Sequence, residues 1–192
     1  MQRIEKQFGA RLASLIADSP TLMADLKSLR RAGVRIRRLN GVCRAYSRSH
    51  PGQKRGALIC IGAHCTAIQQ AHYLAHEAFH ILYGKTPHNF DPNKLSRKKY
   101  VQMALREEAH CLCHELKVAL ELHDAGHFVG AVNLSWLVDY LTGGYRAVRK
   151  RLEHEHVSVA ALTYPQYYGW LYDRRAQKTG AARRLTRRQR TA

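Results

Sequence analysis

A segment of five residues carries the side chains that zinc-dependent hydrolysis requires: His76-Glu77-Ala78-Phe79-His80. Residues four apart on a helix share one face, so the imidazoles of His76 and His80 can bind one zinc ion together. Glu77 directly follows the first histidine, which places its carboxylate beside the metal. Zinc lowers the pKa of a bound water from about 15.7 to about 7, so Glu77 can act as the general base. We therefore predict Zn²⁺ as the cofactor, His76 and His80 as ligands, and Glu77 as the catalytic residue.

A third ligand must come from further along the chain, because a catalytic zinc ion has three protein ligands and one open position. The long H-E-x-x-H-x-x-G-x-x-H pattern fails, since Tyr83 and Thr86 occupy its last two fixed positions. His88 follows shortly afterwards and is one candidate. Glu107 and Glu108 lie in the next predicted helix, from which one carboxylate can reach the metal. Adjacent helical positions differ by about 100°, so only one of these two can face it.

A resemblance to a known family favours Glu108. The H-E-x-x-H helix is followed by the run EAHCLCHEL, which begins at Glu108. Together they resemble the gluzincin-like peptidases of the ImmA/IrrE type, and also small metallopeptidase domains of bacterial toxins, effectors and prophages. In that family the Glu before Ala is the third zinc ligand, which implies this role for Glu108. The resemblance covers residues 57–122; His110 and Cys113 depart from the usual pattern, and the C-terminal third has no counterpart.

Other reactive side chains near the motif are assigned to packing or support. His72 extends the histidine ladder by a turn, but three successive turns are too long for one tetrahedral ion. Cys111 and Cys113 project to nearly opposite sides of a helix, so we interpret them as core residues. The odd number of cysteines, five, indicates reduced thiols. Candidates for stabilising the oxyanion are His110, His114, His127, Tyr140, Tyr145 and Tyr164.

The elements that must position these residues follow from the hydrophobic pattern. The predicted helices span residues 2–31 with a break at Ser19-Pro20, 66–83, 95–122, 130–141 and 145–154, and an aromatic segment at residues 164–172 precedes the basic tail. The predicted strands span residues 34–39, 42–47 and 57–61. Residues 42–47 could form an edge along which an extended substrate pairs. The fold class is therefore α+β: a mostly helical, zincin-like domain with a small three-stranded sheet packed on the active-site helix.

Length and charge define the domain organisation. A single domain is predicted over residues 1–173, followed by a basic, flexible tail at residues 174–192. The formal net charge is +18, and eight basic residues and no acid lie after Asp173. The tail thus carries a little under half of the excess charge, which favours an acidic protein substrate or contact with nucleic acid.

The sequence predicts a zinc-dependent endopeptidase that hydrolyses a specific protein, as a bacterial effector, toxin or regulatory protease. The alternative is a basic nucleic-acid-associated protein, or a protease recruited to DNA, in which the zinc site is secondary. A third reading is a catalytically silent zincin used for interaction. The chain shows no apolar run of about 20 residues and no signal peptide, so we expect no transmembrane segment and a cytoplasmic location, unless a dedicated secretion system delivers the protein.

Overall fold

The computed structural model describes residues 1–40, 45–50, 53–87, 90–128, 130, 133–157 and 161–190. Helices dominate and a three-stranded mixed sheet accompanies them, so the predicted α+β class is confirmed. The helices are α1 (Gln2–Phe8), α2 (Ala10–Asp18), α3 (Pro20–Arg31), α4 (Ala67–Tyr83), α5 (Arg97–Asp124), α6 (Leu134–Leu152) and α7 (Tyr164–Arg190). The strands are β1 (Arg35–Leu39), β2 (Ala45–His50) and β3 (Gln53–Gly62). No helix in these ranges is long and apolar enough to cross a membrane.

The N-terminal helical stretch has one more break than the sequence predicts. Ser19 separates α2 from α3, and its side chain accepts a hydrogen bond from the Leu22 backbone N–H. A second break falls at Gly9, whose φ of 95° lies in a region that other residues rarely adopt. The helical spacing of apolar residues continues across Gly9, which is why the hydrophobic pattern alone does not reveal this break.

Strand β3 lies in the middle of the sheet, between β1 and β2. It pairs parallel with β1 and antiparallel with β2, so β2 forms an edge. Ile59 and Ile61 of β3 are fully buried, and this explains why the most apolar strand occupies the central place. β2 begins at Ala45; residues 42–44 of the predicted strand lie outside the described residues.

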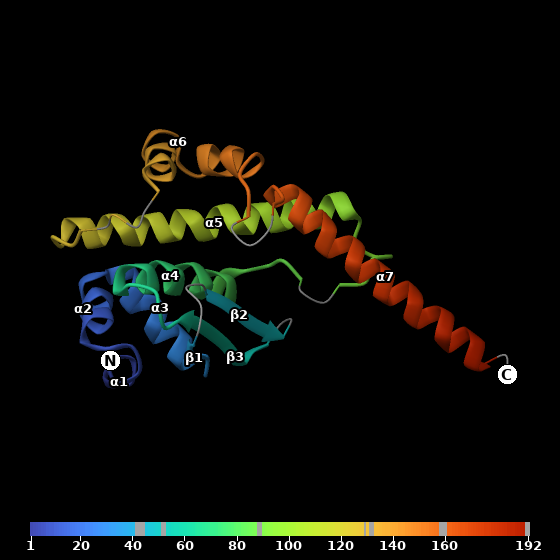
Figure 1. Ribbon diagram of the computed structural model, residues 1–192, viewed down its shortest axis with the longest axis horizontal. Helices are drawn as coiled ribbons and strands as arrows, with labels where there is room; N and C mark the ends of the chain where they lie inside the picture. The colour runs from blue at the N-terminus through green and yellow to red at the C-terminus, as the bar shows by residue number, and fades with distance from the viewer. Residues whose placement is uncertain are drawn as a thin grey trace.

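Helix α4 lies between the sheet and the long helix α5 (Figure 1). A capping box starts α4: the Thr66 side chain accepts from the Gln69 backbone N–H, and the Gln69 side chain accepts from the Thr66 backbone N–H. Leu74, Ala75 and Ala78 pack into the main apolar core with residues of the sheet and of α2. The opposite side of α4, which carries the histidines, faces α5.

Helix α6 lies on the far side of α5 from α4, and α7 crosses α5 at an angle (Figure 1). Gly144 has a non-helical φ of 56°, so α6 is kinked where the sequence predicts two separate helices. A second apolar cluster joins α5 to α6 and includes Ala109, Leu116, Val148 and Leu152. Because α7 continues to Arg190, residue 174, the predicted start of a flexible tail, lies inside a helix, and the structure gives no boundary there.

Candidate metal centre

The two histidines of the motif lie on the face of α4 that meets α5. His76 and His80 are one helical turn apart, and their ring centroids are 5.0 Å from each other. Their side chains are 17% and 15% exposed, so both rings are largely shielded from water. The spacing of the motif thus brings the two imidazoles together on one face of the helix.

Glu108 of α5 joins this pair. Its Oε2 lies 3.3 Å from His76 Nε2, and its Oε1 lies 3.4 Å from His80 Nε2. Ligand atoms about 2.0–2.1 Å from a tetrahedral zinc ion are about 3.4 Å from one another, which matches both separations. The structure therefore brings together the three residues that the sequence singled out as ligands, with a different oxygen of Glu108 beside each imidazole.

Glu107, the rival third ligand, faces the other nitrogen of His80. Its Oε1 lies 2.7 Å from His80 Nδ1, and its Oε2 accepts hydrogen bonds from the backbone N–H groups of Lys85 and Thr86, at 2.6 Å each. Gly84 permits this close approach, since a Cβ atom there would lie 2.6 Å from the carboxylate. Glu107 thus holds His80 by Nδ1 and leaves Nε2 directed towards Glu108.

Glu115 supports His76 in the same way. Its Oε2 lies 3.3 Å from His76 Nδ1, and its Oε1 lies 3.7 Å from Nδ1 of His72, one turn earlier in α4. Burial lowers the pKa of His72 more than Glu115 raises it, which favours a neutral ring. The structure therefore places His72 beside a supporting carboxylate and not among the converging donors.

Buried charge makes this site attractive for a cation. Burial raises the pKa of Glu108, but the imidazoles of His80 and His76 outweigh burial and lower that pKa well below its usual value. Burial likewise lowers the pKa of both histidines, but Cys111 and Glu108 outweigh it and raise both pKa values well above the usual range. The positive charge of the protonated imidazoles offsets the negative charge of the acidic groups around them. A divalent cation can replace those protons.

Cys111 adds a fourth donor, which the sequence interpretation placed in the core. It lies three residues after Glu108, on the same face of α5. Its Sγ and one nitrogen each of His76 and His80 lie within 4.8 Å of one another. The thiol is fully buried, and burial raises its pKa more than the two imidazoles lower it. The sequence signal for Cys111 is its E-x-x-C spacing from Glu108, which follows a zinc-binding motif. Cys113, in contrast, packs against the second apolar cluster.

Tyr168 of α7 reaches the centre from a third helix, and the sequence analysis did not identify it. Its hydroxyl donates a hydrogen bond to Glu108 Oε1. Burial, together with Glu108, raises the pKa of Tyr168 well above its usual value, so the hydroxyl keeps its proton. Tyr164, a predicted oxyanion donor, lies one turn earlier, and burial and Glu108 raise its pKa as well. Sequence alone does not distinguish the tyrosine that bonds to Glu108 from its aromatic neighbours.

The other predicted oxyanion donors have partners elsewhere. His114 and His127 bond to aspartates of α3 and α2, at 2.6 Å and 2.8 Å. His110 stacks on Tyr145, with ring centroids 4.3 Å apart. Tyr140 packs against the second apolar cluster. These contacts place the side chains against other groups, whereas the Tyr168 hydroxyl bonds directly to Glu108.

Glu77 lies in α4 between the two histidines and is partly exposed. Its role as the general base stays a prediction. His88 lies outside the described residues, so its candidacy as third ligand stays a prediction.

Two cavities of the described region are lined by residues other than His76, His80, Glu108 and Cys111. A cavity of about 360 Å³ adjoins Glu107 and is lined by α4 and α5 residues that include Phe79 and His110. A larger groove of about 700 Å³ is formed by N-terminal elements. The candidate metal centre is therefore defined by its donor side chains and not by a cavity.

Comparison of the chain with known proteins finds no matching family model, no matching curated protein and no matching solved structure. The resemblance to the ImmA/IrrE type therefore stays a prediction. The assignment of the metal centre depends on the geometry of its own side chains.

Proposed function

We propose that this protein is a zinc-dependent peptidase whose metal is held by His76, His80 and Glu108. The observation that carries the proposal is the convergence of these donors at separations of 3.3 Å and 3.4 Å. Each histidine is also held by a carboxylate at its other nitrogen. Such carboxylate–histidine pairs orient an imidazole for metal binding and make it a stronger ligand.

The surrounding residues have separate tasks in hydrolysis. Glu77 accepts a proton from the attacking water and passes it to the leaving amine. Zinc, when bound, acidifies the water and polarises the carbonyl group of the scissile peptide bond. Glu107 and Glu115 hold the two rings, and Tyr168 orients Glu108 through its hydrogen bond.

Charge and the sheet edge support a protein substrate. The formal net charge of +18 favours an acidic chain, and β2 is an edge strand along which an extended peptide can pair. The family resemblance adds a role as an effector, toxin or regulatory protease. Nucleic acid remains the alternative partner of the basic C-terminal residues.

The metal content of the purified protein tests the site. Wild type should bind one zinc ion per chain, and His80→Ala and Glu108→Ala should lose it, because each removes one of three ligands. Glu153→Ala removes an exposed carboxylate of a surface ion pair and should keep the zinc. Circular dichroism confirms that each variant is folded. A zinc-supplemented wild type without metal would overturn the proposal.

Glu77→Gln tests the chemistry separately from metal binding. The variant should keep its zinc ion and lose cleavage of a mixed library of acidic peptides, followed by mass spectrometry, because an amide cannot accept the proton. Cleavage at the wild-type rate would exclude Glu77 as the base.

One observation favours a second function, a structural zinc site in a catalytically silent protein. Cys111 supplies a fourth donor beside the two histidines, and four protein ligands would leave no open position for water. In that case zinc would stabilise the packing of α4 on α5, and Glu77→Gln would change neither zinc content nor any activity.

A further inference from the structure

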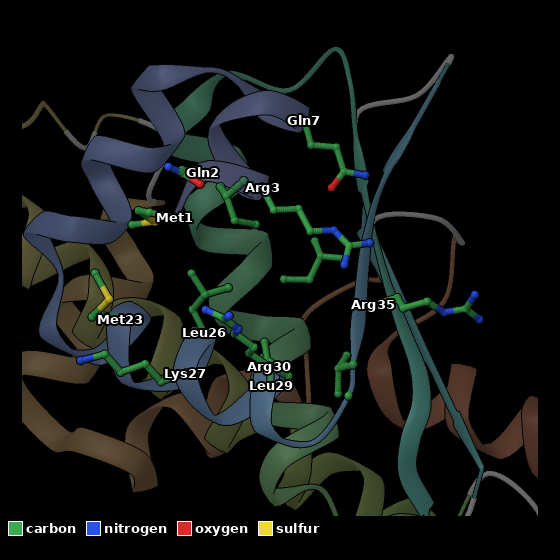
Figure 2. A pocket seen from close by; sticks show the side chains of 14 residues that line it. Met1, Gln2, Arg3, Gln7, Met23, Leu26, Lys27, Leu29, Arg30 and Arg35 are labelled. Atoms are coloured by element: carbon green, nitrogen blue, oxygen red, sulfur yellow. The ribbon is translucent and has the colours of Figure 1, made fainter.

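A groove of about 700 Å³ lies among the N-terminal elements, apart from the metal centre (Figure 2). Residues of α1, of α3 and of the start of β1 form its walls. Its volume falls within the range of about 300–1,000 Å³ that is typical of binding sites. None of the residues proposed for zinc binding or hydrolysis lines it.

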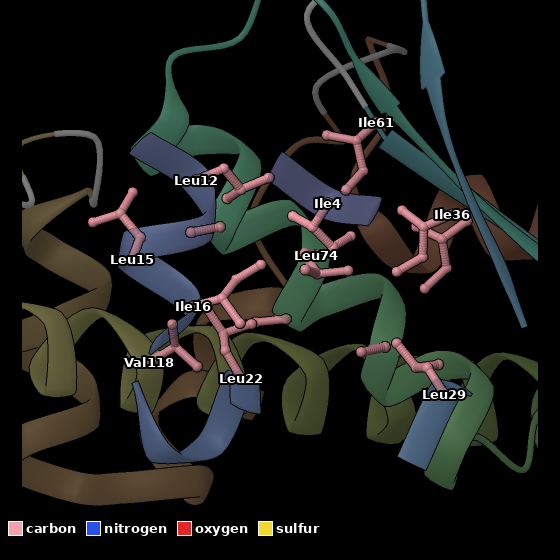
Figure 3. Close-up of a cluster of buried hydrophobic side chains, with 14 of the residues drawn as sticks. Ile4, Leu12, Leu15, Ile16, Leu22, Leu29, Ile36, Ile61, Leu74 and Val118 are labelled. Carbon is pink, nitrogen blue, oxygen red and sulfur yellow. The ribbon is translucent and has the colours of Figure 1, made fainter. Parts of the chain in front are cut away.

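The floor of the groove is a partly exposed extension of the main core. Ile4, Leu29 and Ile36 are nearly buried and belong to that core (Figure 3). Met23 and Leu26 are only half-buried and pack against it. Methionine adapts its shape to different apolar surfaces, which suits a docking surface for side chains of a partner.

Four cations surround this apolar floor: Arg3 of α1, Lys27 and Arg30 of α3, and Arg35 of β1. All four are exposed, and no acidic residue lines the groove. Among the described residues, no ion pair uses any of the four. The groove therefore complements a ligand that is apolar on one side and negatively charged on the other.

Gln7 provides a polar group without a partner. Its Oε1 atom is buried and accepts no hydrogen bond in the described part of the chain. Gln7 and Arg3 both reach from α1 towards β1 across the groove (Figure 2). Because Gln7 lines the groove, its side-chain amide is the group there that can exchange hydrogen bonds with a ligand. A peptide main chain can form such hydrogen bonds, whereas an acyl chain cannot.

We propose that the groove binds an acidic, amphipathic peptide segment of a partner protein. Apolar side chains of the segment cover Met23 and Leu26, its carboxylates pair with the surrounding cations, and its main chain hydrogen-bonds the side-chain amide of Gln7. Binding of this segment does not involve zinc or Glu77, so it is independent of the proposed peptidase activity.

The probe is a synthetic peptide of about 16 residues with Leu at three- and four-residue spacing and Glu at the remaining positions. Fluorescence anisotropy with the full chain should give saturable binding, with a Kd of about 1–100 µM. The double variant Lys27→Glu/Arg30→Glu should weaken binding at least about tenfold. The matched variant Lys98→Glu/Lys99→Glu changes the net charge equally on exposed residues of α5, and it should bind like wild type.

A further variant tests the contribution of the apolar floor to peptide binding separately from that of the cations. Leu26→Asn keeps every charge and should also weaken binding, because it removes apolar contact area. Thermal unfolding of each variant confirms that the fold is retained. Three results would overturn the proposal: no saturable binding up to about 1 mM peptide, equal weakening in both double variants, or binding of decanoate but not of the peptide, which would make a small anionic amphiphile the occupant.

Discussion

Glu107 determines which nitrogen of His80 is available to a metal ion. It contacts His80 Nδ1 and accepts two backbone hydrogen bonds, so both of its oxygens are engaged. In Glu107→Gln the side chain loses its charge, and its amide can no longer satisfy all three donors. We expect zinc affinity to fall by about 10–100-fold, measured by competition with a chelating dye.

The control for this variant is Glu153→Gln, an exposed carboxylate on the C-cap of α6. It should bind zinc like wild type. Unchanged affinity in a folded Glu107→Gln protein would mean that helix packing alone orients the His80 ring.

Whether Cys111 binds the zinc ion decides between a site with an open position for water and a site closed by four protein ligands. We expect Cys111→Ser to keep both zinc and peptide cleavage, because burial favours the protonated thiol and three other donors already converge. Substitution of cobalt for zinc gives an optical test, since a thiolate ligand produces a charge-transfer band in the near ultraviolet. A band present in wild type and lost in Cys111→Ser would instead support the structural zinc site.

On the scale of helices, the sequence predicts contacts within one helix better than contacts between helices. The four-residue spacing of His76 and His80 suffices to place them on one face of α4. The selection of Glu108 over Glu107 depends on how α5 is rotated against α4, which local spacing does not determine. The contact from Tyr168 depends in addition on where α7 crosses α5, so no local pattern predicts it.

Glu121 connects α5 to the start of α3. Its carboxylate accepts hydrogen bonds from the Ser19 hydroxyl at 2.5 Å, the Thr21 backbone N–H at 3.0 Å and the Thr21 hydroxyl at 2.5 Å. In Glu121→Gln these donors face a neutral amide. We expect the free energy of unfolding, measured by urea denaturation at neutral pH, to fall by about 2 kcal/mol, while zinc content stays at one ion per chain.

The effect of this variant should shrink in acid. Burial raises the pKa of Glu121, but hydrogen bonds from Ser19 and Thr21 outweigh burial and lower it below the usual 4.5. A carboxylate with a lowered pKa stabilises the fold above its unfolded pKa, and this contribution is lost as the pH falls through the folded pKa. Wild type and Glu121→Gln should therefore converge in stability below about pH 4.5. A difference that persists undiminished at about pH 2 would contradict this assignment.

For the whole molecule, the fold class follows from local patterns, but the topology does not. Alternation in residues 34–39 predicts a half-buried strand, and β1 covers Arg35–Leu39. Asn40-Gly41 indicates a change of direction without indicating which strand will lie beside β1. The order β1-β3-β2 arises because burial of Ile59 and Ile61 places β3 in the centre, and such burial depends on helices distant in sequence.

The excess positive charge permits a test of the nucleic-acid alternative that does not involve the metal centre. Replacing the eight basic residues after Asp173 by Gln keeps the chain length and removes their positive charges. Each phosphate neutralised by a protein cation adds about −0.9 to the slope of log K against log salt for duplex DNA. If the tail contacts DNA, the variant should bind a random duplex at least about tenfold more weakly at low salt, with a shallower slope in anisotropy titrations.

Its zinc content should not change, because Asp173 and every residue before it are retained. Equal slopes for the two proteins would mean that the residues after Asp173 make no phosphate contacts, and any DNA binding would then have to depend on basic residues that precede Asp173.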